Sequence, residues 1–181
     1  MSGPRCEVPP QSLDAIIRLT EAIRKDTKIR SDLFPVLEFL EFGMPRIFPG
    51  FALEVGAKEE MGPNHGLTIP SENVIRLRED VYDGLCRGGG RDRFTAAHEL
   101  GHYIMHRNVS IVFHRAENGR LPPYRDSEWQ ANSFAGALLM PERAMRECGS
   151  LAEIAQLFGV SLAAAEVQNR QLSRRGMKVL N

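Results

Sequence analysis

The stretch that decides the fold runs from position 93 to position 102 and reads RFTAAHELGH. Within it, His98, Glu99 and His102 form an HExxH motif. On a helix, a step of four residues places both imidazoles on one face, close enough to share one metal ion. Glu99 is rotated about 100° from His98, so it can reach a water on that ion more easily than the ion itself. This is the position that a general base needs.

The residues around the motif favour a helix with a buried face. Asp92 is a candidate N-cap, and an apolar stripe recurs at helical spacing: Phe94, Ala97, Gly101 and Ile104. Gly101 is a poor helix former, which indicates that another element packs closely against this turn. This context favours a metal site over a chance match in a solvated, charged helix.

A catalytic zinc ion usually takes three protein ligands and leaves one position for water, so a third ligand must lie downstream. A metzincin-type site requires a glycine at position 105 and a histidine at position 108, where this chain has Met105 and Asn108. That class is excluded. His106 lies roughly 12 Å from His98 along a straight helix, too far to join the same ion comfortably. We interpret His106 as a residue of the pocket or the core.

The next predicted helix offers a carboxylate. Glu128 lies in its first turn, and Asn132 lies one turn later on the same face, where its amide can support a ligand. Glu117 and Asp126 are alternatives, and a glutamate at a helix N-terminus is also favoured by the helix dipole alone. Spacing therefore leaves the third ligand open.

Composition excludes several broad classes of protein. Basic and acidic residues balance at 23 each, so no overall field directs the chain to nucleic acid or to an anionic membrane. Its three cysteines form no CxxC pair and fit a reducing compartment. We find no apolar run typical of a signal peptide or a membrane span. The expected location is the cytoplasm, without membrane association.

The rest of the pattern predicts an α+β fold. We expect a flexible leader over 1–11 and a single domain over 12–181, made of N-terminal helices (12–45), a catalytic core (50–142) and helix-turn-helix-like C-terminal helices (150–175). Within the core, period-two alternation predicts a short antiparallel three-stranded sheet, which we expect to pack on the HExxH helix.

Two segments resemble nucleotide- or DNA-binding motifs without their chemistry. The glycines at 88–90 are not followed by the Lys-Ser or Lys-Thr pair of a P-loop, so we predict a loop there. Residues 151–172 have the spacing of a helix-turn-helix, but the would-be recognition helix from Leu162 is mostly alanine, with Glu166 and a single arginine. We predict that these helices pack against the domain and do not bind nucleic acid.

Two blocks of sequence together resemble the ImmA/IrrE family of metallo-endopeptidases. They are RFTAAHELGH at 93–102, and EWQANSFA at 128–135 with LLMP at 138–141. The resemblance covers roughly residues 50–172 and implies a compact, zincin-like fold of the gluzincin kind. It also implies one Zn²⁺ ion and a role for four residues: His98, His102 and Glu128 as the ligands, and Glu99 as the catalytic base.

The resemblance further implies a function. Family members are bacterial or are carried by phages and mobile elements, and several are thought to cleave a helix-turn-helix repressor encoded beside them. The implied activity is zinc-dependent endopeptidase action by promoted-water hydrolysis, with a regulatory protein as substrate. Manganese or iron would also suit these ligands. Four residues have donors suited to oxyanion stabilisation, and spacing does not choose among them: Tyr103, His106, His114 and Tyr124.

A different class of function keeps the zinc and discards catalysis. In that alternative the chain is a catalytically weak, zinc-containing binding partner in a repressor or toxin–antitoxin pair. The complete set of three ligands and a base favours the enzyme. A neighbouring helix-turn-helix gene would point to a repressor as the substrate or partner.

Overall fold

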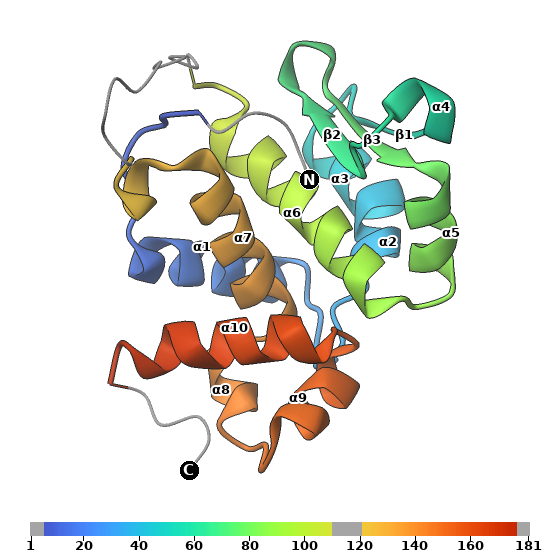
Figure 1. Cartoon of the computed structure of the whole chain (residues 1–181). Coiled ribbons are helices and arrows are strands. Elements are labelled where there is room, and N and C mark those ends of the chain that lie inside the picture. Colours follow the sequence, from blue (N-terminus) through green and yellow to red (C-terminus); the bar gives the residue numbers. More distant parts are fainter. Residues whose placement is uncertain (1–5, 110–120, 177–181) are drawn as a thin grey trace.

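The computed structural model describes residues 6–109 and 121–176 (Figure 1). Its described elements, in chain order, are α1 (Leu13–Asp26), α2 (Val36–Glu38), the π-helix η1 (Phe39–Gly43), α3 (Met44–Ile47), β1 (Ala52–Gly56), α4 (Lys58–Met61), β2 (Gly66–Ile69), the 3-10 helix η2 (Pro70–Glu72), β3 (Val74–Arg78), α5 (Glu79–Cys86), α6 (Gly90–His106), the 3-10 helix η3 (Pro123–Arg125), α7 (Ser127–Leu139), α8 (Glu142–Met145), α9 (Leu151–Phe158) and α10 (Leu162–Ser173). The predicted α+β class is confirmed. No helix in the described ranges is long and apolar enough to cross a bilayer.

Polar side chains begin several of these helices. Ser12, Asp126, Ser150 and Ser161 each accept a hydrogen bond from a backbone N–H in the first turn of α1, α7, α9 and α10. Such caps satisfy donors that the helix itself leaves unpaired. Helix α6 instead begins at Gly90, after Gly89, so the predicted cap at Asp92 lies inside its first turn.

Helix α6 lies at the centre of the molecule, between α7 on one side and the sheet with α5 on the other (Figure 1). Its contact with α7 depends on Gly101, where an added Cβ would lie 3.0 Å from the Phe134 ring. The fully buried Ala97, Leu100 and Leu138 belong to the same core. The close packing predicted from Gly101 is therefore present, and it fixes the distance between α6 and α7.

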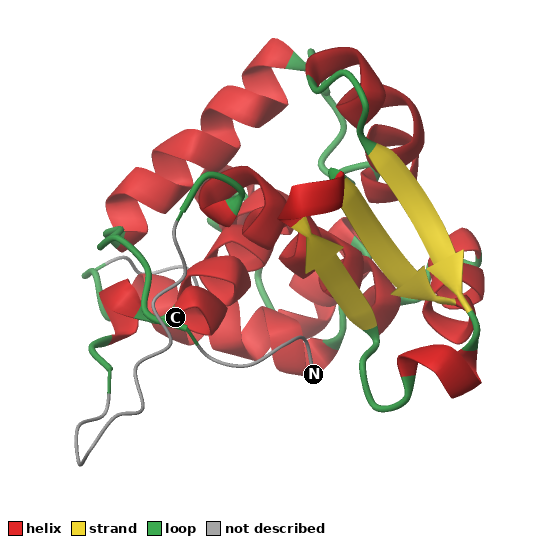
Figure 2. Cartoon of the chain, turned by 90° about the horizontal axis from the view of Figure 1, so that it is seen from above, coloured by secondary structure: helices red, strands yellow, loops and turns green. Residues whose placement is uncertain are grey.

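The sheet is mixed, so the predicted antiparallel arrangement is wrong in part. Strand β3 lies between β1 and β2, pairing antiparallel with β2 and parallel with β1. Figure 2 shows the three strands side by side. The four-residue connection after β2 closes a tight hairpin, whereas the longer segment containing α4 carries the chain past the place that β3 fills. Strand alternation alone does not determine this order.

Of the leader predicted over 1–11, residues 6–11 are held against the start of α7 by backbone hydrogen bonds, and residues 1–5 lie outside the described residues. Cys6 and Val8 are buried, and Glu7 pairs with Asp126 as an isolated antiparallel bridge. Backbone hydrogen bonds join Val8 to Arg125, and Ser127 to Cys6. We call residues 6–11 the N-terminal strap. Its pairing partner lies about 120 positions away in sequence, as the Cys6–Ser127 separation of 121 shows.

The C-terminal helices α9 and α10 meet at Gly159, which has a positive φ of 58° that glycine adopts without strain. Helix α10 packs on α7: Gln171 donates a hydrogen bond to Ser133, and a Cβ at Gly136 would lie 2.4 Å from the Gln168 side-chain oxygen. The buried Arg93 of α6 donates to the Gly159 carbonyl. The predicted C-terminal helix pair is therefore built into the domain.

Candidate metal centre

Three side chains converge where α6 meets the first turn of α7. His98 Nε2 and His102 Nε2 lie 3.0 Å apart, and the Glu128 carboxylate oxygens lie 3.4 and 3.1 Å from them. One ligand atom from each residue falls within 4.8 Å of the others, an arrangement that could hold a metal ion. The side chains are only 7%, 15% and 18% exposed. The structure thus brings together the two histidines of the motif and the glutamate of the next helix.

The chemistry of these donors suits a cation. His98 Nδ1 lies 3.0 Å from Asn132 Oδ1, which can only accept, so Nδ1 carries the proton. His98 Nε2 is then the nitrogen that faces the cluster and can bind a cation. Two imidazole nitrogens and a carboxylate are the ligand set of many catalytic zinc sites. Asn132 supports His98, and not Glu128 as the helical spacing predicted.

Glu99 is almost completely buried beside this cluster. The Thr68 hydroxyl lies 2.9 Å from Glu99 Oε2 and from the Glu99 backbone carbonyl, so it tethers this residue to β2. The other carboxylate oxygen, Oε1, is buried and has no hydrogen-bond partner among the described residues. Leaving a buried acceptor unpaired costs about 1–3 kcal/mol. Such an oxygen is available to a reactant.

Strand β2 also shapes the space around Glu99. A Cβ at Gly66 would lie 2.6 Å from Glu99 Cγ and 3.0 Å from its Oε1. Only glycine lets the strand approach this closely without displacing the carboxylate. Gly66 and Thr68 therefore fix the position of Glu99 from the edge of the sheet.

The charges of the cluster depend on one another. Burial acts to raise the pKa of Glu128, but hydrogen bonds to His102 and His98 outweigh it and lower this pKa to about 2. Burial acts to lower the pKa of His98, yet the hydrogen bond to Glu128 and the nearby charge of Glu99 raise it overall. Burial lowers the pKa of His106 to about 4. Glu128 is thus held as a carboxylate.

The remaining predicted residues are distributed around the cluster. His106 Nδ1 lies 3.1 Å from His102 Nδ1, on the side away from Glu128's carboxylate contact with Nε2. Tyr103 is fully buried against Phe48 and Phe51, and its hydroxyl donates to Asn73, so its contacts are structural. His114 lies outside the described residues, as does the alternative ligand Glu117. The other alternative ligand, Asp126, caps α7.

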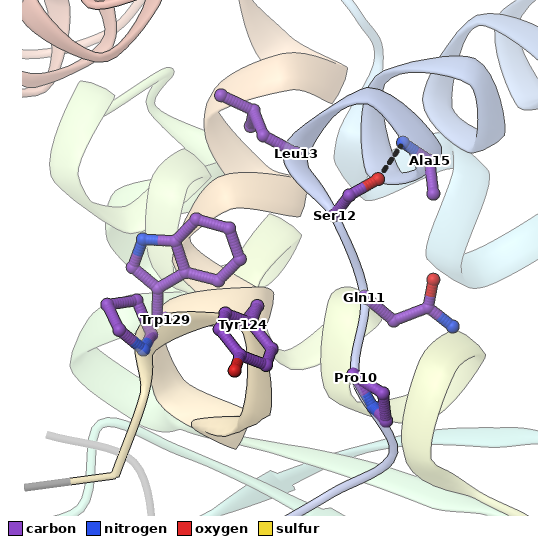
Figure 3. A pocket seen from close by; sticks show the side chains of 8 residues that line it. Pro10, Gln11, Ser12, Leu13, Ala15, Tyr124 and Trp129 are labelled. Carbon is purple, nitrogen blue, oxygen red and sulfur yellow. Dashed lines mark hydrogen bonds between the residues drawn. The ribbon is translucent and has the colours of Figure 1, made fainter.

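Tyr124 lines a groove and is half exposed. The groove has a volume of about 630 Å³ and lies between the N-terminal region and the start of α7. Figure 3 shows Tyr124 and Trp129 facing Pro10 and Gln11 across it. Trp129 follows Glu128 in sequence but points into this groove, and the three cluster residues do not line it.

Sequence reasoning did not single out Gly66, Thr68 or Gln130. Gly66 carried a usable signal, because a glycine within a strand often marks the close approach of another group. Thr68 and Gln130 carried none, since their contacts with Glu99 and His106 join residues 31 and 24 positions apart.

The helix pair with its His-His-Glu cluster defines a metallopeptidase-like fold, and comparison with known proteins agrees. The family model described as IrrE N-terminal-like domain (Peptidase_M78) matches residues 88–168, which include α6, α7 and the three cluster residues. The resemblance to the ImmA/IrrE family, predicted from two blocks of sequence, is confirmed over that stretch. No curated protein matches the chain.

Among solved structures, the chain is similar to a Mycobacterium tuberculosis transcriptional regulator, with a TM-score of 0.55 and 16% sequence identity. The similarity covers 84% of this chain and 45% of that one, so this chain spans under half of the other's length. At this identity the likeness concerns the fold alone.

Proposed function

We propose that the chain is a zinc-dependent endopeptidase in which His98, His102 and Glu128 hold the ion and Glu99 is the general base. The convergence of these three side chains within 4.8 Å is the observation that carries the proposal. The buried Oε1 of Glu99, which has no hydrogen-bond partner among the described residues, supports it, because buried polar atoms usually have one and a reacting carboxylate needs a free oxygen. The family match adds support for the peptidase class.

When bound, the ion supplies Lewis-acid chemistry, lowering the pKa of a coordinated water and polarising a carbonyl. Glu99 takes a proton from the attacking water through Oε1 and passes it to the leaving amine as the peptide C–N bond breaks. Thr68, bonded to Oε2, keeps the carboxylate oriented during both transfers.

The proposed substrate is an extended segment of a cytoplasmic regulatory protein, such as a helix-turn-helix repressor encoded nearby in a bacterial genome. Strand β2 is the better of the two edge strands for holding it, because β2 carries Gly66 and Thr68 beside Glu99. A segment added to that edge would pair through backbone hydrogen bonds and pass close to the catalytic carboxylate.

The test is cleavage of a proteome-derived peptide library, read by mass spectrometry, with zinc content measured in the same samples. We expect the wild type to hold one zinc and to cut, Glu99→Gln to hold zinc and not to cut, and His98→Ala to lose zinc. Zinc binding with cleavage unaffected by Glu99→Gln would refute the assigned base. Zinc binding without any cleavage, also with the neighbouring repressor as substrate, would favour the binding-partner alternative.

A further inference from the structure

A series of hydrogen-bonded side chains runs from Gln130 through His106 to Nδ1 of His102. Gln130 is fully buried on α7. Its Nε2 lies 2.9 Å from the Pro9 carbonyl of the N-terminal strap and 2.8 Å from the Tyr124 carbonyl. Both carbonyls can only accept, so the NH₂ group must face them. The Gln130 carbonyl Oε1 is thereby directed at His106.

The orientation of Gln130 determines where the protons lie on the next two rings. His106 Nε2 is 2.9 Å from Gln130 Oε1, so this nitrogen carries a proton and donates it. In the neutral ring, Nδ1 is then an acceptor. It lies 3.1 Å from His102 Nδ1, which must be the donor. His102 Nε2, which faces His98 and Glu128, is then the nitrogen that can bind a metal ion.

We propose that Gln130 and His106 are positioning residues that hold His102 in the tautomer able to bind metal through Nε2. The strap takes part, because the Pro9 carbonyl fixes the Gln130 amide. Within the described part of the chain, Asn132 holds His98 in the equivalent tautomer. The two histidine ligands are thus oriented by separate supports, one of which connects the metal centre to the N-terminal strap. This inference rests on the proposed metal site.

Removing the acceptor at position 130 breaks the first hydrogen bond of the series that links Gln130, His106 and His102. In Gln130→Met, His106 can place its proton on Nδ1, where it faces the Nδ1 proton of His102. His102 then favours the tautomer with Nε2 protonated, which competes with the metal. Loss of such an orienting partner typically weakens metal affinity by about 10–100-fold.

The experiment measures the zinc dissociation constant by competition with a chromogenic chelator, together with histidine tautomers by ¹⁵N NMR of the metal-free protein. We expect Gln130→Met to weaken zinc binding about 10–100-fold. The matched control is Gln168→Met, which removes an equally buried glutamine from α10 and should bind zinc as the wild type does. His106→Asn, whose side-chain oxygen can accept from His102, should bind zinc more tightly than His106→Leu.

The NMR signal separates orientation from stability. In the wild type, His106, assigned by its absence in His106→Asn, should show a pyrrole-like Nε2 and a pyridine-like Nδ1. The opposite tautomer would overturn the proposal, and so would a Gln130→Met protein that melts at a lower temperature yet binds zinc like Gln168→Met. Wild-type zinc affinity in His98→Ala would instead refute the underlying metal site.

Discussion

Two helix pairs of this molecule are built on opposite principles. The α6–α7 pair buries polar groups at its centre, among them His98, Glu99 and Gln130, and each is oriented by named partners. The α9–α10 pair buries mainly apolar side chains, among them Ile154, Phe158, Ala165 and Leu172, with Gln168 as a buried polar residue of α10. Its outer surface carries Leu157, Leu162 and Val167.

This difference separates a helix pair that buries polar side chains beside an apolar core from a helix pair that buries mainly apolar side chains. Buried polar groups contribute little net stability even when they are well paired, so a polar interior indicates chemistry. An apolar interior contributes stability without directing any reactive group. Substitutions in α9–α10 should therefore change stability alone, whereas substitutions in α6–α7 should also change metal binding or activity.

The largest effect on stability is expected at Phe158, which is completely buried. Phe158→Ala should lower the free energy of unfolding by about 3–5 kcal/mol, because it removes a large ring and leaves a cavity. Denaturant unfolding measures this loss. The folded variant should retain the zinc affinity of the wild type; a large loss of affinity would show that α9–α10 also shapes the metal centre.

A smaller loss of stability, with a second effect on the metal, is expected at Gly101. Gly101→Val places methyl groups against Phe134 and should cost about 1–3 kcal/mol through overpacking. The forced separation of α6 and α7 should also weaken zinc binding. Gly101→Ala is the control: its 3.0 Å contact opposes a helix-propensity gain of about 1 kcal/mol, so the net change should be small. Unchanged zinc affinity in Gly101→Val would contradict the role given to helix spacing.

Thr68 should affect activity more than stability. Thr68→Val keeps the shape but removes the donor to Glu99 Oε2, and hydrogen bonds to charged groups are worth about 1.5–3 kcal/mol. The corresponding expectation is at least about a tenfold lower kcat/KM with zinc content unchanged. Thr95→Val, which loses a bond to the Arg91 carbonyl on the same helix as the motif, serves as the control. Equal activity in Thr68→Val and Thr95→Val would contradict the role that we give Thr68 in orienting Glu99.

The smallest effect is expected on the outer surface of α10. Leu162 and Val167 are 59% and 56% exposed, so Leu162→Ser and Val167→Ser should each change the free energy of unfolding by about 0.5 kcal/mol or less. Zinc affinity should not change. A loss of several kcal/mol would show that this surface is covered by another part of the protein in solution.

Sequence alone predicted the centre of the site because its spacing is local. His98, Glu99 and His102 lie within one helical segment, where a step of four residues determines the geometry. Glu128 needed the second sequence block, since position alone left other carboxylates open. The resemblance carried that choice.

The supports around the site could not be predicted in the same way. Thr68 with Glu99, Gln130 with His106, and the N-terminal strap with Gln130 are contacts between distant segments, and no periodic pattern encodes them. The order of the strands could not be predicted for the same reason, because the position of β3 between its neighbours depends on tertiary packing.

We propose above that His98, His102 and Glu128 together hold the ion. X-ray absorption at the zinc edge tests it most directly, on the wild type and on His98→Ala and Glu128→Gln. We expect imidazole scattering from two histidines at about 2.0–2.1 Å in the wild type. One histidine should be lost in His98→Ala, and both should remain, with weaker binding, in Glu128→Gln. A sulfur shell, or a histidine signal unchanged in His98→Ala, would contradict it.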